Sequence, residues 1–502
     1  MWGLLSCALL LLFSLALMGF FVYCGYIQYI HMKYDHIPGP PRDSFLLGHM
    51  PSILKVIKNN DLIHNLFLEW AKIYGPVVRY NTLHHVTILL TTPEGVKEVL
   101  LSPKYSKDAA YNRAVSVFGV RLMGNGLVTD QDNEHWRKQR NMIDPAFRRN
   151  YLVGLMEPFN EKAEALMKKL SEKIRSNRKV KMHDMMSRLA LDVIAKVAFG
   201  LEMDCVNDDQ TPFPQAILLV MKGLTESLNP WAKYLPGKQA FIRDVQKSAR
   251  LIRQTGKECI ERRQRAIQKG EDVPEDILTR ILNAADLEED CNPEILVDNF
   301  VTFFIGGQET TANHLAFSVM ELARNPEILQ KAQAEVDNVI GSKRNIEYED
   351  LANLQYLSQV LKEALRLYPT APATSRAVRG ELVIGGVRIP PNVTVMLNSY
   401  VMGRMEQFYQ DPLTFNPDRF SPDSAKPYFT YFPFSLGPRS CIGQTFAQME
   451  SKVVMAKLLQ RFDFQLAGEQ SFKLIDTGTL RPMDGVICTL EPRTSQRGTG
   501  NY

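Results

Sequence analysis

The sequence Phe434-Ser435-Leu436-Gly437-Pro438-Arg439-Ser440-Cys441-Ile442-Gly443 predicts a glycine-containing loop that leads into a helix over residues 444–461. A lone cysteine is usually a small buried apolar residue rather than a reactive one. Cys441, however, stands at the start of a helix, where the dipole and unpaired N–H groups favour a thiolate. The glycines let a flat group approach the backbone closely. Without a Cys or His partner nearby, the thiolate cannot complete a zinc site, but it can serve as the axial ligand of a haem.

A long apolar helix is predicted over residues 293–325, with two adjacent glycines, Gly306 and Gly307, inside it. Each glycine costs roughly 1 kcal/mol relative to alanine within a helix. Close helix packing would explain the pair, and so would room for a flat cofactor and for dioxygen. The Thr310 hydroxyl can bond to a carbonyl one turn earlier and loosen the helix. These residues therefore predict a polar notch in an apolar wall.

Five motifs together resemble those of the cytochromes P-450, the haem-thiolate monooxygenases. The first is the loop around Cys441. The other four precede this loop in the chain and stand in the family's order. They are Trp136-Arg137-Lys138-Gln139-Arg140, Gly306-Gly307-Gln308-Glu309-Thr310-Thr311, Glu363-Ala364-Leu365-Arg366 and Phe415-Asn416-Pro417-Asp418-Arg419-Phe420. The resemblance covers about residues 36–493. It implies a mainly α fold with minor β structure, in which one large helical domain with small sheets binds haem b.

The resemblance also implies roles for single residues. Cys441 would be the axial iron ligand, and Glu309 and Thr310 would deliver protons during oxygen activation. Haem binding is expected from Trp136, Arg140, Arg376 and Arg439 at the propionates, and from Phe434 in the cysteine loop. Arginine suits this task because its planar fork matches a carboxylate. For Arg137 and Lys138 the simpler interpretation is a solvated helix face, which could also help dock an acidic redox partner.

Glu363, Arg366 and Arg419 are expected to be structural. We predict a buried carboxylate between two guanidinium groups that fixes the cysteine-loop region. Losing one partner would leave an unpaired buried charge and cost several kcal/mol. These residues should therefore not be mistaken for catalytic acids.

The composition is that of a packed globular protein. Of 502 residues, 45% are apolar and 23% are charged, which excludes wholesale disorder, a collagen-like fibre and a polytopic membrane protein. A net charge of +4 gives no argument for nucleic-acid binding. The seven cysteines show no pairing pattern, which favours a reducing compartment.

The N-terminus is predicted to be a membrane anchor. Residues 1–32 contain no Lys, Arg, Asp or Glu, and 4–23 are almost wholly apolar. A cleaved signal peptide is the alternative, but no positive segment precedes the apolar run and the run is long. Because Lys33 and Arg42 follow it, the bulk of the chain is expected in the cytoplasm. A single-pass protein of the endoplasmic reticulum is therefore predicted.

Beyond the anchor, the sequence predicts a proline-rich hinge over residues 33–43, one domain over 44–493 and a flexible tail over 494–502. Gly385-Gly386 indicates a hairpin turn within 382–389. Strands are expected at 77–80 and 86–90. Helical periodicity predicts helices at 157–175, 185–200, 240–269, 293–325, 327–340 and 355–367.

Electrons are expected from outside the chain, because no GxGxxG or phosphate loop indicates a nicotinamide or flavin domain. The resemblance implies NADPH as their source, through the external flavoprotein NADPH–cytochrome P-450 reductase.

Four framework segments, residues 36–41, 298–305, 400–405 and 429–437, resemble those of a sterol side-chain hydroxylase. A sterol is therefore the expected substrate. A fatty acid or xenobiotic is the alternative. The predicted pocket residues, each of which could equally be core packing, are Phe118, Leu122, Ile217, Met221, Phe303, Phe304 and Ala371. A reductase-independent haem-thiolate isomerase or dehydratase, which tends to lose the acid–threonine pair, and a non-catalytic lipid-binding protein remain as rival classes.

Overall fold

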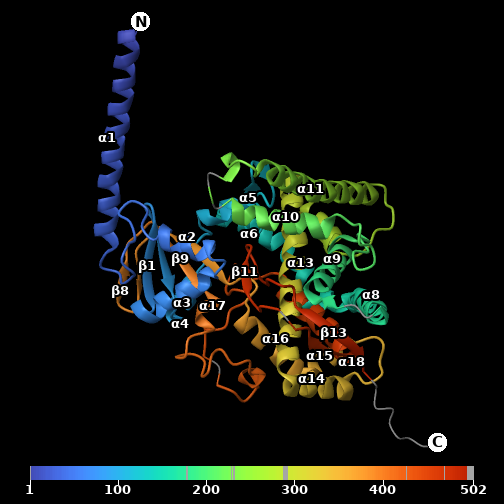
Figure 1. Ribbon diagram of the computed structural model, residues 1–502. Helices are drawn as coiled ribbons and strands as arrows, with labels where there is room; N and C mark the ends of the chain where they lie inside the picture. The colour runs from blue at the N-terminus through green and yellow to red at the C-terminus, as the bar shows by residue number, and fades with distance from the viewer. Residues whose placement is uncertain are drawn as a thin grey trace, which may run out of the picture. The chain divides into compact units, whose positions relative to one another are not determined.

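The computed structural model describes residues 2–176, 179–227, 229, 232–286, 292–425, 427–468 and 470–493. The predicted tail over 494–502 lies outside them. The chain forms two compact units (Figure 1). The first unit comprises Met1–Asp108, Ala373–Gln410 and Tyr428–Thr430, and the second comprises Ala109–Pro372, Asp411–Pro427 and Tyr431–Tyr502. The predicted mainly helical fold with small sheets is confirmed.

The first unit is built around a four-stranded sheet of order β1-β2-β9-β6, in which β2 and β9 are parallel and the other pairs antiparallel. The hairpin β7–β8 turns at Gly385 and Gly386, which both have positive φ, as predicted. The strands are β1 (Val77–Thr82), β2 (His85–Leu90), β6 (Ala373–Val378), β7 (Leu382–Ile384), β8 (Val387–Ile389) and β9 (Val393–Asn398). The helices are α1 (Trp2–Tyr34), α2 (Met50–Lys58), α3 (Ile63–Tyr74), α4 (Pro93–Leu101) and α17 (Ser399–Met402).

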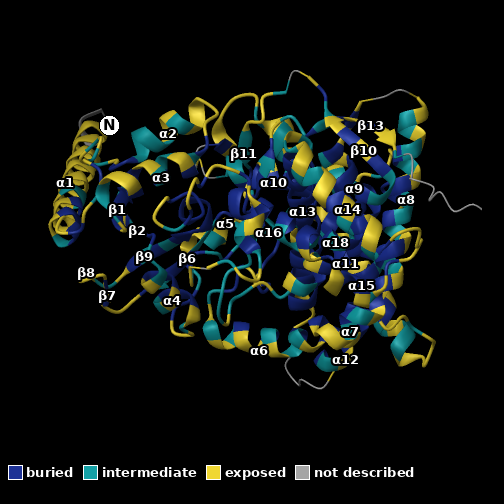
Figure 2. Cartoon of the chain, turned by 90° about the horizontal axis from the view of Figure 1, so that it is seen from below, coloured by how far each residue is buried: buried dark blue, intermediate teal, exposed yellow. Residues whose placement is uncertain are grey.

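Helix α1 exposes its apolar side chains along most of its length (Figure 2). The stretch Leu5–Tyr34 is long enough to cross a bilayer, and its most apolar 18-residue window has a mean hydropathy of 2.5. The last turns of α1 pack within the first unit. Ile27 and Tyr34 are buried, and the Tyr34 hydroxyl donates to the Pro391 carbonyl at 2.9 Å. The proline-rich segment that follows is non-helical and lies against β1, where Arg79 N donates to Pro38 O at 2.7 Å.

The second unit is mostly helical. Its helices are α5 (Asn112–Val115), α6 (Asn133–Ile143), α7 (Arg149–Leu152), α8 (Met156–Arg175), α9 (Met182–Phe199), α10 (Phe213–Glu226), α11 (Gln239–Gln268), α12 (Ile277–Ala285), α13 (Pro293–Arg324), α14 (Pro326–Val339), α15 (Tyr348–Asn353), α16 (Gln355–Leu367) and α18 (Gln444–Arg461). Short 3-10 turns cover Ala109–Tyr111, Asp144–Phe147, Val153–Leu155, Ala232–Tyr234 and Pro417–Phe420. Three small sheets have the orders β10-β13-β5, β11-β12 and β3-β4. Their strands are β3 (Ser116–Val117), β4 (Val120–Arg121), β5 (Val180–Lys181), β10 (Phe462–Leu466), β11 (Leu474–Asp476), β12 (Leu480–Pro482) and β13 (Ile487–Pro492).

Helix α13 forms the core of the second unit and is buried over most of its length (Figure 2). The Asn292 side chain caps its first turn by accepting from Glu294 N at 2.9 Å. His314 joins three helices, because its Nε2 donates to Leu361 O in α16 at 2.9 Å and its Nδ1 lies 3.4 Å from the Ser451 hydroxyl in α18. Burial lowers the pKa of His314 to about 4, so the imidazole is neutral and serves as a structural link.

Candidate active site

The cysteine loop is closed by its own backbone. Cys441 N donates to Phe434 O at 2.8 Å and Ser440 N donates to Gly437 O at 3.0 Å. Gly437 has a φ of 69°, which glycine adopts without steric cost. Cys441 lies two residues before Gly443, the N-cap of α18, and its side chain is accessible. Burial of the surrounding site raises the pKa of the Cys441 thiol, whereas the Gly443 N–H and the Arg140 charge lower it.

Helix α13 carries an open notch in its middle. Gly306 is exposed although Ile305 and Gln308 beside it are buried, and a Cβ at Gly306 would meet no atom within 4 Å. The Thr310 hydroxyl donates to Gly306 O at 2.7 Å, which is the bond to the preceding turn that the sequence predicts. Gly307 differs from Gly306, because a Cβ there would press on Ile194 of α9. Close packing therefore explains Gly307, and open space explains Gly306.

Glu309 lies beside Thr310 and is buried, with 5% of its surface exposed. Its Oε2 accepts from the Thr479 hydroxyl at 3.0 Å. Thr479 lies in the turn between β11 and β12, so a segment 170 residues away along the sequence holds this carboxylate.

Helix α6 brings polar groups to the cysteine loop. Arg140 donates from Nη1 to Ser440 O at 2.8 Å and from Nε to Asp144 Oδ1 at 2.6 Å. The guanidinium of Arg439 lies over the ring of Trp136, 4.0 Å from its centroid, and donates to Asp130 O at 2.7 Å. A guanidinium has five N–H donors in a planar fork, a geometry that suits an anionic ligand.

Arg376 belongs to the first unit, on β6, and is buried there with 1% exposure. Its Nη1 donates to Thr374 Oγ1 at 2.8 Å and to Ser375 O at 2.9 Å. The structure therefore brings together Trp136, Arg140, Arg439 and Cys441 within the second unit, and it places Arg376 in the first.

Glu363 lies between two guanidinium groups and is fully buried. Arg366 donates to it from Nε and Nη2, both at 2.7 Å, and Arg419 Nε lies 3.4 Å from Glu363 Oε1. Asn416 N donates to the same carboxylate at 2.9 Å. These contacts join α16 to the segment that precedes the cysteine loop. Phe420 of that segment packs on Tyr431, which precedes the cysteine loop, with ring centroids 4.8 Å apart.

The predicted pocket residues occupy different environments. Leu122, Ile217, Met221, Phe303 and Phe304 are buried, Phe118 is half-buried and Ala371 is exposed. Phe303 packs on Phe147 at 5.4 Å between centroids. Phe304 lies among Phe199, Phe213 and Phe300 and is stacked on Phe300 at 5.5 Å. Aromatic core packing accounts for Phe304 without a ligand.

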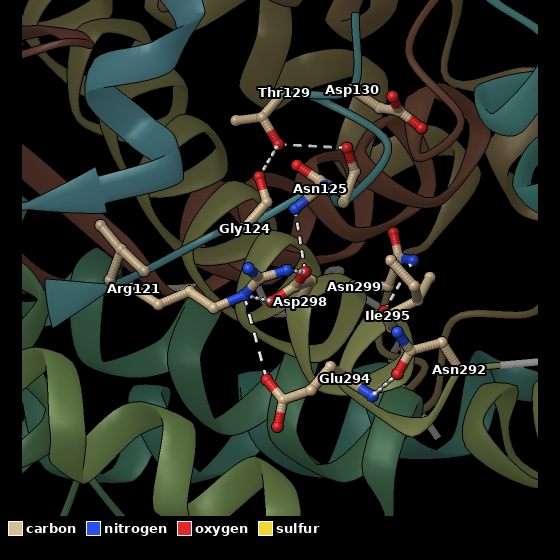
Figure 3. A network of polar contacts seen from close by, with 12 residues as sticks. Arg121, Gly124, Asn125, Thr129, Asp130, Asn292, Glu294, Ile295, Asp298 and Asn299 are labelled. Carbon is tan, nitrogen blue, oxygen red and sulfur yellow. Dashed lines mark hydrogen bonds and ion pairs between the residues drawn. The ribbon is translucent and has the colours of Figure 1, made fainter. Parts of the chain in front are cut away.

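Sequence reasoning missed a polar network around Asp298, near the start of α13 (Figure 3). The fully buried Asp298 carboxylate accepts from Arg121 Nε at 3.0 Å, from Arg253 Nη1 at 2.7 Å and from Asn125 N at 2.8 Å. A Cβ at Gly124 would overlap this carboxylate. The network holds the loop that precedes α6 against helix α13. An acid in an apolar helical stretch could have revealed it, because a buried carboxylate needs partners.

We expect Asp298→Asn to lower the free energy of unfolding by about 3 kcal/mol, because Arg121 and Arg253 would lose their shared counter-charge. Chemical denaturation measures this change. The matched control is Glu294→Gln, an exposed partner of Arg253, for which we expect about 0.5 kcal/mol. Equal effects of the two substitutions would contradict the assignment of the network as structural.

The residues fit a haem. Cys441 supplies one thiolate donor, and within the described ranges no cluster of three or more His, Cys, Asp or Glu could hold a metal ion in another way. The accessible Cys441 side chain, the open space beside Gly306 and the positive charges of Arg140 and Arg439 match a flat, dianionic group.

The comparison with known proteins agrees with this site. The profile of the cytochrome P450 family matches residues 38–489, so the chain belongs to the cytochrome P450 family. It is 27% identical to cytochrome P450 3A12 of Canis lupus familiaris, with 96% of each chain covered. It is also 28% identical to the cytokinin hydroxylase of Arabidopsis thaliana, with 92% of each chain covered. The chain is therefore an enzyme of a family that uses haem and external electron donors.

Proposed function

We propose that this chain is a membrane-anchored monooxygenase that hydroxylates a sterol side chain and that Cys441 is its haem ligand. The observation that carries the monooxygenase assignment is that one compact unit holds an accessible cysteine before α18 and an open notch in α13. These two helices are in contact at Ser451 and His314. When bound, the haem supplies the oxidising chemistry that inserts one oxygen atom of O2 into an unactivated C–H bond.

The protein residues position the haem and supply protons. In this proposal Trp136, Arg140 and Arg439 hold the propionates, and Phe434 shapes the cysteine loop. Thr310 Oγ1 both donates and accepts, so it can pass a proton into the space beside Gly306. Glu309 is the adjacent acid that resupplies it. Glu363, Arg366 and Arg419 keep the site in place.

Thr310→Ala tests the proton relay. We expect haem content and substrate affinity to stay near those of the wild type, while product per NADPH falls about tenfold or more and peroxide replaces it. The two products are quantified in the same reconstituted assay. Thr302→Ala is the control, because the Thr302 hydroxyl makes the same kind of bond, to Asp298 O at 2.8 Å, in the same helix. Unchanged product per NADPH in Thr310→Ala would refute the relay.

The sterol assignment rests on resemblance to cholesterol 24-hydroxylase, of which this chain could be a paralogue. The resembling segments are residues 36–41, 298–305, 400–405 and 429–437. They are mostly framework and therefore indicate lineage. The turn after α16 carries the small side chains of Ala371 and Ala373, whereas the mammalian enzyme is associated with a bulky aromatic residue in this turn. A wider site and more than one hydroxylated carbon are consistent with this difference.

The substrate proposal is tested by difference spectra of the full-length holoenzyme with cholesterol, an oxidised sterol, a fatty acid and a xenobiotic. Product identification follows for each ligand that shifts the spectrum. Hydroxylation on a sterol side chain supports the proposal. Oxidation of only the fatty acid or the xenobiotic would overturn the sterol assignment and leave the haem-thiolate assignment intact.

Membrane attachment and the electron donor complete the proposal. The exposed apolar length of α1 supports a single-pass anchor, and Lys33 and Arg42 after it support a cytoplasmic domain at the endoplasmic reticulum. Arg137 and Lys138 are exposed on α6 and thus suit an acidic surface. We propose NADPH–cytochrome P-450 reductase as the partner that docks there.

A further inference from the structure

A chain of hydrogen bonds runs from Glu309 toward the start of α9. The Thr479 hydroxyl donates to Glu309 Oε2 at 3.0 Å, and Asn313 Nδ2 donates to Thr479 Oγ1 at 3.2 Å. At the far end, His183 Nε2 lies 2.7 Å from Asn313 Oδ1. Because an amide oxygen only accepts, His183 Nε2 carries the hydrogen. Every donor in this chain of hydrogen bonds therefore points toward Glu309.

This direction has a consequence for the carboxyl group. A carboxyl oxygen accepts hydrogen bonds, so all three hydrogen bonds are made when Glu309 Oε2 is turned toward Thr479. Asn313 is fully buried, and Glu309 and Thr479 are nearly so, at 5% and 8% exposure. Water therefore has little access to replace a lost partner, and the three groups depend on one another.

His183 is the half-buried end of the chain. Burial lowers the pKa of His183, and the positive charge of Arg481 on β12 acts in the same direction. The hydrogen bond to Asn313 and the negative charges of Glu309 on α13 and Asp184 on α9 raise it. Glu309 and His183 are thus linked by charge as well as by hydrogen bonds, and linkage acts equally in both directions.

We propose that His183, Asn313 and Thr479 are positioning residues that hold the Glu309 carboxyl group in one orientation for proton delivery. This inference rests on the proposed role of Glu309. Without the Thr479 hydroxyl, the buried Glu309 carboxyl group would lose the donor that holds it. The acid would then lose its fixed orientation, and proton delivery to Thr310 would fail more often.

Thr479→Val tests the proposal, with Thr477→Val as its matched control. Thr477 lies two residues away in the same turn with the same 8% exposure, and its hydroxyl has no hydrogen-bond partner among the described residues. With cholesterol as substrate, we expect peroxide per NADPH to rise about 3- to 10-fold in Thr479→Val. Thr477→Val should match the wild type, and Thr479→Ser should restore its value.

A second readout does not depend on turnover. With ¹³C-labelled histidine, NMR titration follows His183, which is assigned by its absence in His183→Asn. Because the Glu309 charge raises the pKa of His183, Glu309→Gln should make His183 titrate at lower pH. Thr479→Val should move the His183 titration in the same direction, because the Glu309 charge is then no longer held toward Thr479, whereas Thr477→Val should leave the titration unchanged.

The outcomes separate this inference from the proposed function. If Glu309→Gln raises peroxide release but Thr479→Val behaves like Thr477→Val in both readouts, Glu309 acts without the chain and the inference is overturned. If Glu309→Gln leaves peroxide release unchanged while the His183 titration still shifts, the chain exists but the relay assigned to Glu309 is wrong.

Discussion

In Cys441→Ser we expect the red-shifted Soret band, which carbon monoxide produces with ferrous thiolate-ligated haem, to be lost completely. The serine hydroxyl is nearly isosteric, but it stays protonated and donates far less electron density than a thiolate. The loop should keep its shape, because the bond that closes it joins Cys441 N to Phe434 O and does not involve the side chain. The loss should therefore reflect ligation and leave the fold unaffected.

The control for this experiment is Cys259→Ser. The Cys259 thiol is buried, and its Sγ lies 3.6 Å from Phe199 O, a contact that a hydroxyl can also make. We expect this variant to show the same red-shifted carbon monoxide spectrum as the wild type, at similar haem content. A red-shifted band that persists in Cys441→Ser would contradict Cys441 as the axial ligand.

Glu363→Ala is expected to yield little or no folded haem-loaded protein. The substitution would leave Arg366, with only 2% exposure, without its carboxylate, and it would also remove the acceptor of Asn416 N. Breaking a buried ion pair in this way costs about 3–5 kcal/mol, which is a large part of the 5–15 kcal/mol typical of a folded protein. Folded yield and the thermal midpoint measure the loss.

The same region offers a matched comparison for Glu363→Ala. Asp418 lies next to Arg419 and pairs with Lys331 at 3.1 Å, but both side chains are more than half exposed. Because exposed ion pairs contribute about 0–1 kcal/mol, Asp418→Ala should fold almost normally. Glu363→Gln keeps the volume and some acceptors, so it should lie between the two. A stable, haem-loaded Glu363→Ala would show that the ion network is dispensable.

Local sequence signals predicted the long helices, the first two strands and the hairpin. The hairpin at Gly385-Gly386 and the helix that begins at Pro293 were predictable because turn and capping preferences act within a few residues. The cysteine loop was predictable for the same reason. Its position before α18 follows from neighbouring residues alone.

The partners of buried polar groups could not be predicted in this way. Asp298 contacts Arg121, 177 residues earlier, and Glu309 contacts Thr479, 170 residues later. No local pattern encodes these pairs, because tertiary packing decides which polar groups meet. The sequence does indicate that such partners exist, because a carboxylate in a buried helix cannot remain without partners.

The end of α1 limits how a soluble form of the enzyme can be produced. Ile27, Ile30 and Tyr34 are buried, and the Tyr23 hydroxyl lies 3.1 Å from His84 Nδ1. A truncation after Tyr34 would remove these side chains and uncover an apolar edge of the first unit, which promotes aggregation. Cutting before Tyr23 instead retains the contacting turns and removes most of the exposed apolar length.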